Sequence, residues 1–273
     1  MKQLTSLVLV SFLAILPAAA FEPQADNLVQ PLGSGVQILI AVAGNAEGAV
    51  GTHFRSEILI INYRDVDQEV QLFWIPRSGP PFVITVTINA RSGLGSSDFI
   101  GEVLGQTGLG TLVLTPMITG TNNTDTNARL YATARIWTPQ PGTTGTTSQT
   151  LSTVPLAHVS GRRLSMVGLR RDEQYRLNVG VMNLDNDRTQ TFVITVGGNN
   201  PLVTESETIT LPPLSMQQVG MHGQALANLQ VAVDNVTPDE TLATRWFAYG
   251  SSVDNITGDS WSMLGFERPE VAP

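Results

Sequence analysis

The sequence contains no cysteine, and its single lysine, Lys2, stands at the very start. The absence of cysteine excludes disulfide bonds, thiolate zinc sites, iron–sulfur clusters and a cysteine nucleophile. Acidic residues outnumber basic ones by 23 to 15, which gives a formal net charge of −8. Affinity for a phosphate backbone comes from lysine and arginine side chains that release condensed counterions, so we expect no nucleic-acid partner.

Long apolar runs are missing too, except for one near the start of the chain. Residues 1–20 carry an apolar stretch from Leu7 to Leu16, followed by the small residues Ala18-Ala19-Ala20. This pattern is typical of a secretory signal peptide, and the apolar stretch is too short to span a bilayer. We predict cleavage before Phe21 and a mature chain without a transmembrane segment. The protein would then be secreted, periplasmic or retained at the cell surface.

Charged residues are few, 14% of the chain, whereas 42% of the residues are hydrophobic. A disordered chain needs the opposite balance, so we expect a folded protein. Apolar and polar residues alternate in several short runs; Val70, Leu72 and Trp74, for example, share one face of a strand over 69–74. This period of two, interrupted by glycine and proline, predicts β-strands rather than helices.

Two stretches of the chain are similar to each other. Residues 53–63 can be laid on residues 174–184 without a gap, so that an aromatic residue, an arginine, an apolar run and an asparagine coincide. Matched positions lie 121 residues apart there, from 53 to 174, and 118 residues apart at the end of the unit if Tyr131 is aligned with Tyr249. Self-similarity at a near-constant interval indicates two copies of one domain.

The sequence therefore predicts an all-β protein with two tandem antiparallel β-sandwich domains after a cleaved signal peptide. In a sandwich each sheet hides one apolar face against the other. A stretch rich in glycine, threonine and proline separates the copies, and its far end, 149–154, could also return as an edge strand of either domain. The predicted units are a signal peptide (1–20), an N-terminal segment (21–36), a first sandwich (37–138), a linker (139–153), a second sandwich (154–265) and a C-terminal tail (266–273).

The opening and closing strings of the second copy are similar to those of a class of secreted bacterial β-sandwich repeats, mostly uncharacterised. An arginine followed by an apolar strand that ends in asparagine opens such a unit, here Arg176 to Asn183, and a Tyr-x-Ser-x-Val-Asp-Asn-x-x-Gly-Asp string closes it, here Tyr249 to Asp259. More distantly, each opening hairpin resembles that of the β-sandwich family that includes the sensory rhodopsin transducer. The resemblance implies a fold and an extracytoplasmic location, and it brings no catalytic residue with it.

No enzyme motif stands out. The three histidines, His53, His158 and His222, are far apart and have no metal-ligand spacing. The chain has neither a Gly-x-Ser-x-Gly elbow nor a Ser-x-x-Lys motif. We therefore expect a non-enzymatic protein without a cofactor, although a triad assembled from distant residues leaves no local signature.

Acidic residues in predicted turns are candidate calcium ligands, because calcium takes hard oxygen ligands on loops. Aspartate is also common in turns for a local reason, since its carboxylate accepts hydrogen bonds from nearby backbone N–H groups. Both interpretations stay open. The candidate ligands are Asp65, Asp67, Asp185, Asp187, Asp254 and Asp259.

Two tryptophans, Trp137 and Trp246, are candidate sugar-stacking residues, because an exposed indole ring can pack on a sugar face. On strands, tryptophans are also common core residues. The expected function is that of an exported interaction or structural protein that presents loops on rigid sheets, with a protein or a surface glycan as partner. The alternatives are a carbohydrate-binding accessory protein and, third, an enzyme without a recognisable motif.

Overall fold

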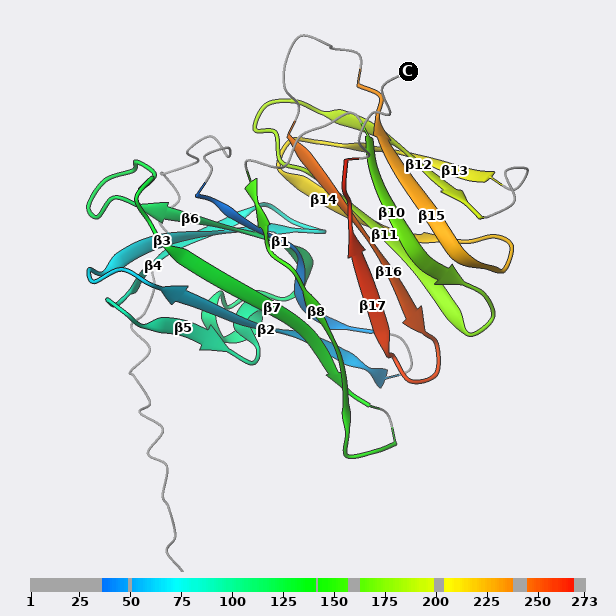
Figure 1. Ribbon diagram of the computed structural model, residues 1–273, viewed down its shortest axis with the longest axis horizontal. Coiled ribbons are helices and arrows are strands. Elements are labelled where there is room, and N and C mark those ends of the chain that lie inside the picture. Colours follow the sequence, from blue (N-terminus) through cyan, green and yellow to red (C-terminus); the bar gives the residue numbers. More distant parts are fainter. Residues whose placement is uncertain are drawn as a thin grey trace, which may run out of the picture.

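The computed structural model describes residues 36–48, 51–140, 142–156, 163–198, 204–237 and 245–267 (Figure 1). The predicted signal peptide, nearly all of the N-terminal segment and most of the C-terminal tail lie outside these residues. The described part is all-β, apart from a π-helical turn η2 over Phe99–Val103. Within it, no helix has the length and apolar character needed to cross a membrane.

The first half of the chain forms a nine-stranded antiparallel sheet with the central order β4-β3-β6-β1-β2-β7-β8. Strand β5 pairs with β2, and β9 pairs with β1. The strands are β1 (Ile38–Glu47), β2 (His53–Asn62), β3 (Gln68–Pro76), β4 (Phe82–Ile88), β5 (Gly93–Ser96), β6 (Gly108–Met117), β7 (Leu130–Pro139), β8 (Thr146–Leu151) and β9 (Val154–Pro155).

Strand β1 joins two layers of this half. It pairs with β6 along much of its length, and at its end, Asn45 to Glu47, it also pairs with β2. The sheet bends at this strand, so that β5-β2-β7-β8 lies in front of β4-β3-β6-β1 (Figure 1). Apolar side chains of both layers, such as Ile60 on β2 and Trp74 on β3, are fully buried. The first half is thus a sandwich whose two layers share one strand.

The second half has two separate four-stranded antiparallel sheets, β10-β15-β12-β13 and β14-β11-β16-β17. A core of buried aliphatic side chains lies between them. Phe192 and Trp246 pack against each other in this core, with their rings tilted. The strands are β10 (Arg163–Arg171), β11 (Tyr175–Asn183), β12 (Gln190–Gly197), β13 (Thr204–Leu211), β14 (Ser215–Met221), β15 (Leu226–Asn235), β16 (Trp246–Asp254) and β17 (Ser260–Leu264).

The two halves have the same topology. The layer β4-β3-β6-β1 corresponds strand for strand to β13-β12-β15-β10, and β5-β2-β7-β8 corresponds to β14-β11-β16-β17. Both pairs of layers follow the chain in the same order, with β2 and β11 as the repeated opening strands. The predicted fold class, two tandem antiparallel β-sandwiches, is confirmed.

The strand register corrects the alignment of the closing strands. Ile61 pairs with Tyr131, and Met182, 121 residues after Ile61, pairs with Phe247. Tyr131 therefore corresponds to Phe247, so its predicted alignment with Tyr249 was wrong by two residues. A shift of two residues keeps every side chain on the same face of a strand, which is why the alternating pattern did not reveal it.

Each half encloses one fully buried asparagine at the end of its opening strand, Asn62 on β2 and Asn183 on β11. In both halves the side chain of this asparagine hydrogen-bonds to the turn after its own strand and to the end of the next hairpin. It therefore connects these two segments. The amide nitrogen donates to the carbonyl groups of Val66, Ile88 and Asn89 in the first half and of Arg188, Leu211 and Pro212 in the second.

The segment predicted as a linker, 139–153, contributes a strand. Its residues Thr146–Leu151 form β8, which pairs with β7 from Ala134 to Pro139. Strand β9 then pairs with the start of β1. The far end of the segment therefore returns as an edge of the first sandwich, which is one of the two alternatives that the sequence left open.

The layer β14-β11-β16-β17 lies between the first half and the layer β13-β12-β15-β10 (Figure 1). Its outer face carries Met182, Phe247 and Tyr249, all of which are buried. The hydroxyl of Thr111 on β6 contacts the sulfur of Met182 at 3.6 Å. Tyr131, the equivalent of Phe247 in the first half, is 52% exposed. The two sandwiches thus pack through a face that is buried only in the second copy.

Candidate functional site

A cleft of about 580 Å³ lies between the two sandwiches. The first sandwich contributes the end of β1, the start of β2, the loop before β6 and single residues after β3, on β7 and on β8. The second sandwich contributes β11, β14, β16 and β17. Pockets that bind small molecules commonly measure ~300–1,000 Å³ and occur at domain interfaces. This cleft, formed only by the two halves together, is the candidate site.

The second wall is rich in side chains that can form hydrogen bonds. Asn178 on β11, Ser251 on β16 and Ser260 on β17 line it, and their side chains have no hydrogen-bond partner among the described residues. Strands β11 and β16 are paired along both edges, so their backbone groups are already bonded within the sheet. Recognition on this wall must therefore come from side chains.

Tyr249 and Gln218 form a fixed pair in the same wall. The ring of Tyr249 lies so close to Gly180 that a Cβ on this glycine would be 2.0 Å from a ring carbon. The hydroxyl of Tyr249 donates to Oε1 of Gln218 at 2.7 Å. Burial raises the pKa of Tyr249, against the opposing charge of Arg77, so the phenol stays neutral and donates. The amide nitrogen of Gln218 is left as a donor toward a ligand.

Two arginines line the cleft, one from each sandwich: Arg77 after β3 and Arg176 on β11. Arg176 donates to the Asn255 side chain at 3.1 Å. Burial lowers the pKa of Arg176, and the charge of Asp254 opposes this effect. Within the described part of the chain, neither guanidinium has a carboxylate within 4.0 Å, although seven other arginines do: Arg55, Arg64, Arg91, Arg135, Arg163, Arg170 and Arg171.

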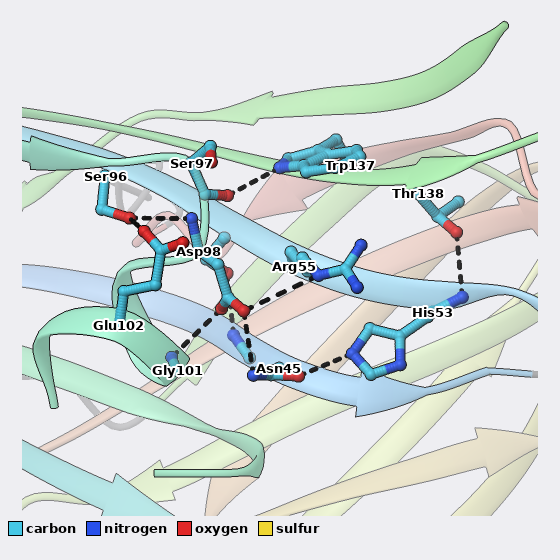
Figure 2. Close-up of polar contacts among 12 residues, drawn as sticks. Asn45, His53, Arg55, Ser96, Ser97, Asp98, Gly101, Glu102, Trp137 and Thr138 are labelled. Atoms are coloured by element: carbon cyan, nitrogen blue, oxygen red, sulfur yellow. Dashed lines mark hydrogen bonds and ion pairs between the residues drawn. The ribbon is translucent and has the colours of Figure 1, made fainter. Parts of the chain in front are cut away.

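Glu47 also lines the cleft, but its carboxylate already has a partner. Its Oε1 lies 2.7 Å from Nδ1 of His53, whose Nε2 lies 2.6 Å from Oδ1 of Asn45. Figure 2 shows that Asn45 in turn faces Asp98, to which its amide nitrogen donates at 3.0 Å. Both ring nitrogens of His53 thus face an oxygen atom of a neighbouring side chain. The network holds Glu47 on His53 instead of on the arginines.

Trp137, a predicted sugar-stacking residue, lies outside the cleft, and its side chain is held by two contacts. Its indole nitrogen donates to the Ser97 carbonyl at 2.8 Å, as Figure 2 shows. The guanidinium of Arg55 stands over its ring, 5.4 Å from the centroid, and also pairs with Asp98. One face of this ring is therefore already occupied by a cation.

Trp246, the second predicted sugar-stacking residue, is a core residue. It is 1% exposed and packs against Phe192, with the ring centroids 5.1 Å apart. An indole ring in that position has no face to offer a sugar, so the prediction for Trp246 was wrong. The strand alternation did not reveal it, since every residue of β16 is buried, on one face by the sandwich core and on the other by the first half.

The predicted calcium ligands do not converge. Within the described part of the chain, no group of three or more histidine, aspartate or glutamate side chains is placed to hold a metal ion. Three of the six carboxylates accept backbone hydrogen bonds in their own turns, as the turn interpretation predicts, and Asp67 accepts one from the turn after β4. The donors are Ala90 for Asp67, Asp187 and Arg188 for Asp185, Ile256 and Thr257 for Asp254, and Ser260 for Asp259, while Asp65 pairs with Arg91 and Asp187 is exposed.

Asp254 stabilises the β16–β17 turn in a pH-dependent way. Hydrogen bonds, first from Thr257 N–H and then from Ile256 and Gln174, hold the pKa of Asp254 below its usual 3.8, although burial opposes them. Because the folded pKa is the lower one, the stabilisation is present above about pH 4 and lost as the pH falls through the folded value. We expect Asp254→Asn to lower the urea midpoint at pH 7, and the difference from wild type to close between pH 4 and pH 2.

Asp187→Asn is the matched control, because Asp187 is exposed and its carboxylate accepts no hydrogen bond from the described residues. Its midpoint should follow that of the wild type at every pH. A gap between Asp254→Asn and wild type that stays constant down to pH 2 would contradict the assignment.

Several lining residues were not identified from the sequence. Arg77 follows β3 in an exposed turn, Gln218 lies on an unremarkable strand, and Gln149 falls in the segment predicted as a linker. They come together only because the two sandwiches pack against each other. The one sequence signal, the use of arginine for every Lys or Arg position after Lys2, concerns Arg77 and not the two glutamines.

Comparisons with protein-family models, with curated proteins and with solved structures found no match to this chain. The resemblance to secreted bacterial repeats and to the sensory rhodopsin transducer family therefore stays a prediction. The strings that carried it have structural roles here: Asn183 binds three loop carbonyls, and Asp254 caps a hairpin turn. The function is argued below from the cleft.

Proposed function

We propose that the protein is an exported, non-enzymatic interaction protein that holds a polar ligand in the cleft between its two sandwiches. The observation that carries this proposal is the wall of unpartnered polar side chains, Asn178, Ser251 and Ser260, on a rigid sheet. Polar groups placed in a cleft of this size fix the orientation of a bound molecule. Export is inferred from the signal peptide predicted over residues 1–20.

Binding is a better account of this cleft than catalysis. A serine nucleophile needs a general base within hydrogen-bond reach. The histidine that lines the cleft, His53, has both ring nitrogens engaged, by Glu47 and by Asn45. Ser251 and Ser260 have no hydrogen bond to it. The residues therefore favour a site that orients a ligand without activating a nucleophile.

The duplication provides a matched pair of variants to test the cleft. Asn178 and Glu57 occupy the same position on β11 and β2, and only Asn178 lines the cleft. We expect Asn178→Trp to fill the cleft and abolish ligand binding, whereas Glu57→Trp should leave binding unchanged. Calorimetric titration with four probes would measure this: galactotriose, trigalacturonate, trialanine and triglutamate.

The proposal stands if at least one probe binds to the wild type and to Glu57→Trp but not to Asn178→Trp. It fails if no probe binds at millimolar concentration, or if Asn178→Trp retains all the binding that the wild type shows. The thermal midpoints of both variants should stay close to that of the wild type, because both positions are at least partly exposed.

A further inference from the structure

The arginines of the cleft point to the class of ligand. Arg77 and Arg176 reach the same cavity from different sandwiches, and the one carboxylate among the described lining residues, Glu47, is bonded to His53. The chain as a whole has a formal net charge of −8. Two cations without a carboxylate partner therefore create a local positive field in an otherwise acidic protein, and such a field attracts an anion.

Desolvation strengthens this argument for Arg176. Its guanidinium is partly buried, donates to the Asn255 amide oxygen and lies beyond ion-pair distance of every described carboxylate, Asp254 included. Partial burial disfavours the charged guanidinium, and the charge of Asp254 opposes this effect from beyond ion-pair distance, so a closer counterion would stabilise the cation further. Its counterpart in the first half, Arg55, has Asp98 as a partner. A ligand carboxylate would supply the partner that Arg176 lacks.

The other lining groups favour a saccharide over a peptide. A peptide that binds by strand addition needs an unpaired strand edge. The strands of this wall, β11 and β16, are paired on both sides. What the wall offers are side-chain amides and hydroxyls, together with apolar surface from Phe54, Ile136 and Val253. Amides and hydroxyls suit the hydroxyl groups of a sugar, and apolar surface suits its C–H face.

We propose that the cleft binds a short acidic saccharide, whose carboxylate is held between Arg77 and Arg176 and whose hydroxyl groups bond to Asn178, Gln218 and Ser251. Arginine is suited to this task because its planar fork of donors matches a carboxylate. The cavity of about 580 Å³ has room for a saccharide of two or three units. This inference rests on the proposed function and narrows it to one ligand class.

The role of the two positive charges in the cleft is tested with the variants Arg77→Gln and Arg176→Gln. Arg129→Gln is the control. Arg129 is exposed, lies outside the cleft and has no carboxylate partner among the described residues, so its removal changes the net charge equally. We expect each cleft variant to weaken trigalacturonate binding by about tenfold or more, because each loses a charge-assisted hydrogen bond. Arg129→Gln should stay within about twofold of the wild type, the size expected of a distant screened charge.

The four probes separate this inference from the proposed function. Tight binding of trigalacturonate with weak binding of galactotriose supports the acidic saccharide. Equal binding of the two sugars overturns the carboxylate contact and leaves the cleft as a binding site. Tighter binding of triglutamate overturns the saccharide assignment in favour of an acidic peptide.

A loss of trigalacturonate affinity in Arg129→Gln equal to that in the cleft variants overturns the two-arginine contact, since the effect would then be one of net charge. Arg77 lies in an exposed turn, so Arg77→Gln tests the contact without affecting folding.

Discussion

Replacing Phe247 with aspartate should destabilise the folded protein by about 4 kcal/mol or more. Phe247 is 2% exposed and lies on the outer face of β16, beside Met182, which touches the first sandwich. The substitution removes a large apolar side chain from the interface and places a carboxylate there without a partner, and both changes disfavour the folded state. Urea unfolding of the full chain would measure the loss.

The control for this prediction is Tyr131→Asp. Tyr131 occupies the same position in the first half, pairs with Ile61 as Phe247 pairs with Met182, and is 52% exposed. The same carboxylate in solvent should cost no more than about 1 kcal/mol. Equal losses in the two variants would show that the exposed face of the first sandwich is covered in solution, and no loss in Phe247→Asp would show that the sandwiches do not pack as described.

Replacing Asn183 with alanine should cost about 3 kcal/mol or more. Its amide donates to three carbonyl groups, and its Oδ1 accepts from Asp185 N–H at 3.0 Å and from the Gln190 amide at 2.6 Å. Since Asn183 is fully buried, water cannot replace these bonds, and the groups that it leaves unpaired raise the cost. The urea midpoint and its slope would give the change in free energy of unfolding.

Asn122→Ala is the comparison for Asn183→Ala. Asn122 is exposed, and its side chain has no hydrogen bond to the described residues, so its loss should be close to neutral. Asn62→Ala should cost slightly less than Asn183→Ala, because Asn62 donates the equivalent three bonds but its Oδ1 accepts one bond, from Arg64 N–H, instead of two. A cost for Asn183→Ala no larger than that for Asn122→Ala would disprove the structural role of the repeated asparagine.

The repeat was visible in the sequence because the opening strands of the two copies, β2 and β11, make the same local contacts. The arginine, the apolar run and the asparagine coincide since β2 and β11 have the same neighbours and the same turn to bind. The closing strands were aligned two residues off, because their constraint is only alternation, which a shift of two preserves. The two copies can therefore be aligned correctly from the sequence where a buried polar residue, such as Asn62 or Asn183, is required at one position.

The turn carboxylates show how one pattern fits two functions. Asp185 and Asp254 have the residue type and the loop position of calcium ligands, yet both bond to backbone N–H groups two and three residues ahead. Nothing in the local sequence separates these two roles, because a metal site depends on ligands from several turns meeting at one point. In the described part of the chain they do not meet.

The sequence by itself determined the all-β class, the duplication and the turns, because each depends on neighbours along the chain. Only the tertiary structure decided which face of each copy is buried and which cations remain unpaired. Phe247 is buried and Tyr131 exposed at one and the same strand position, because one sandwich stacks on the other in one direction only. The same stacking brings Arg77 and Arg176, which are 99 residues apart in the chain (176 − 77), to a shared cleft, a proximity that no pattern along the chain encodes.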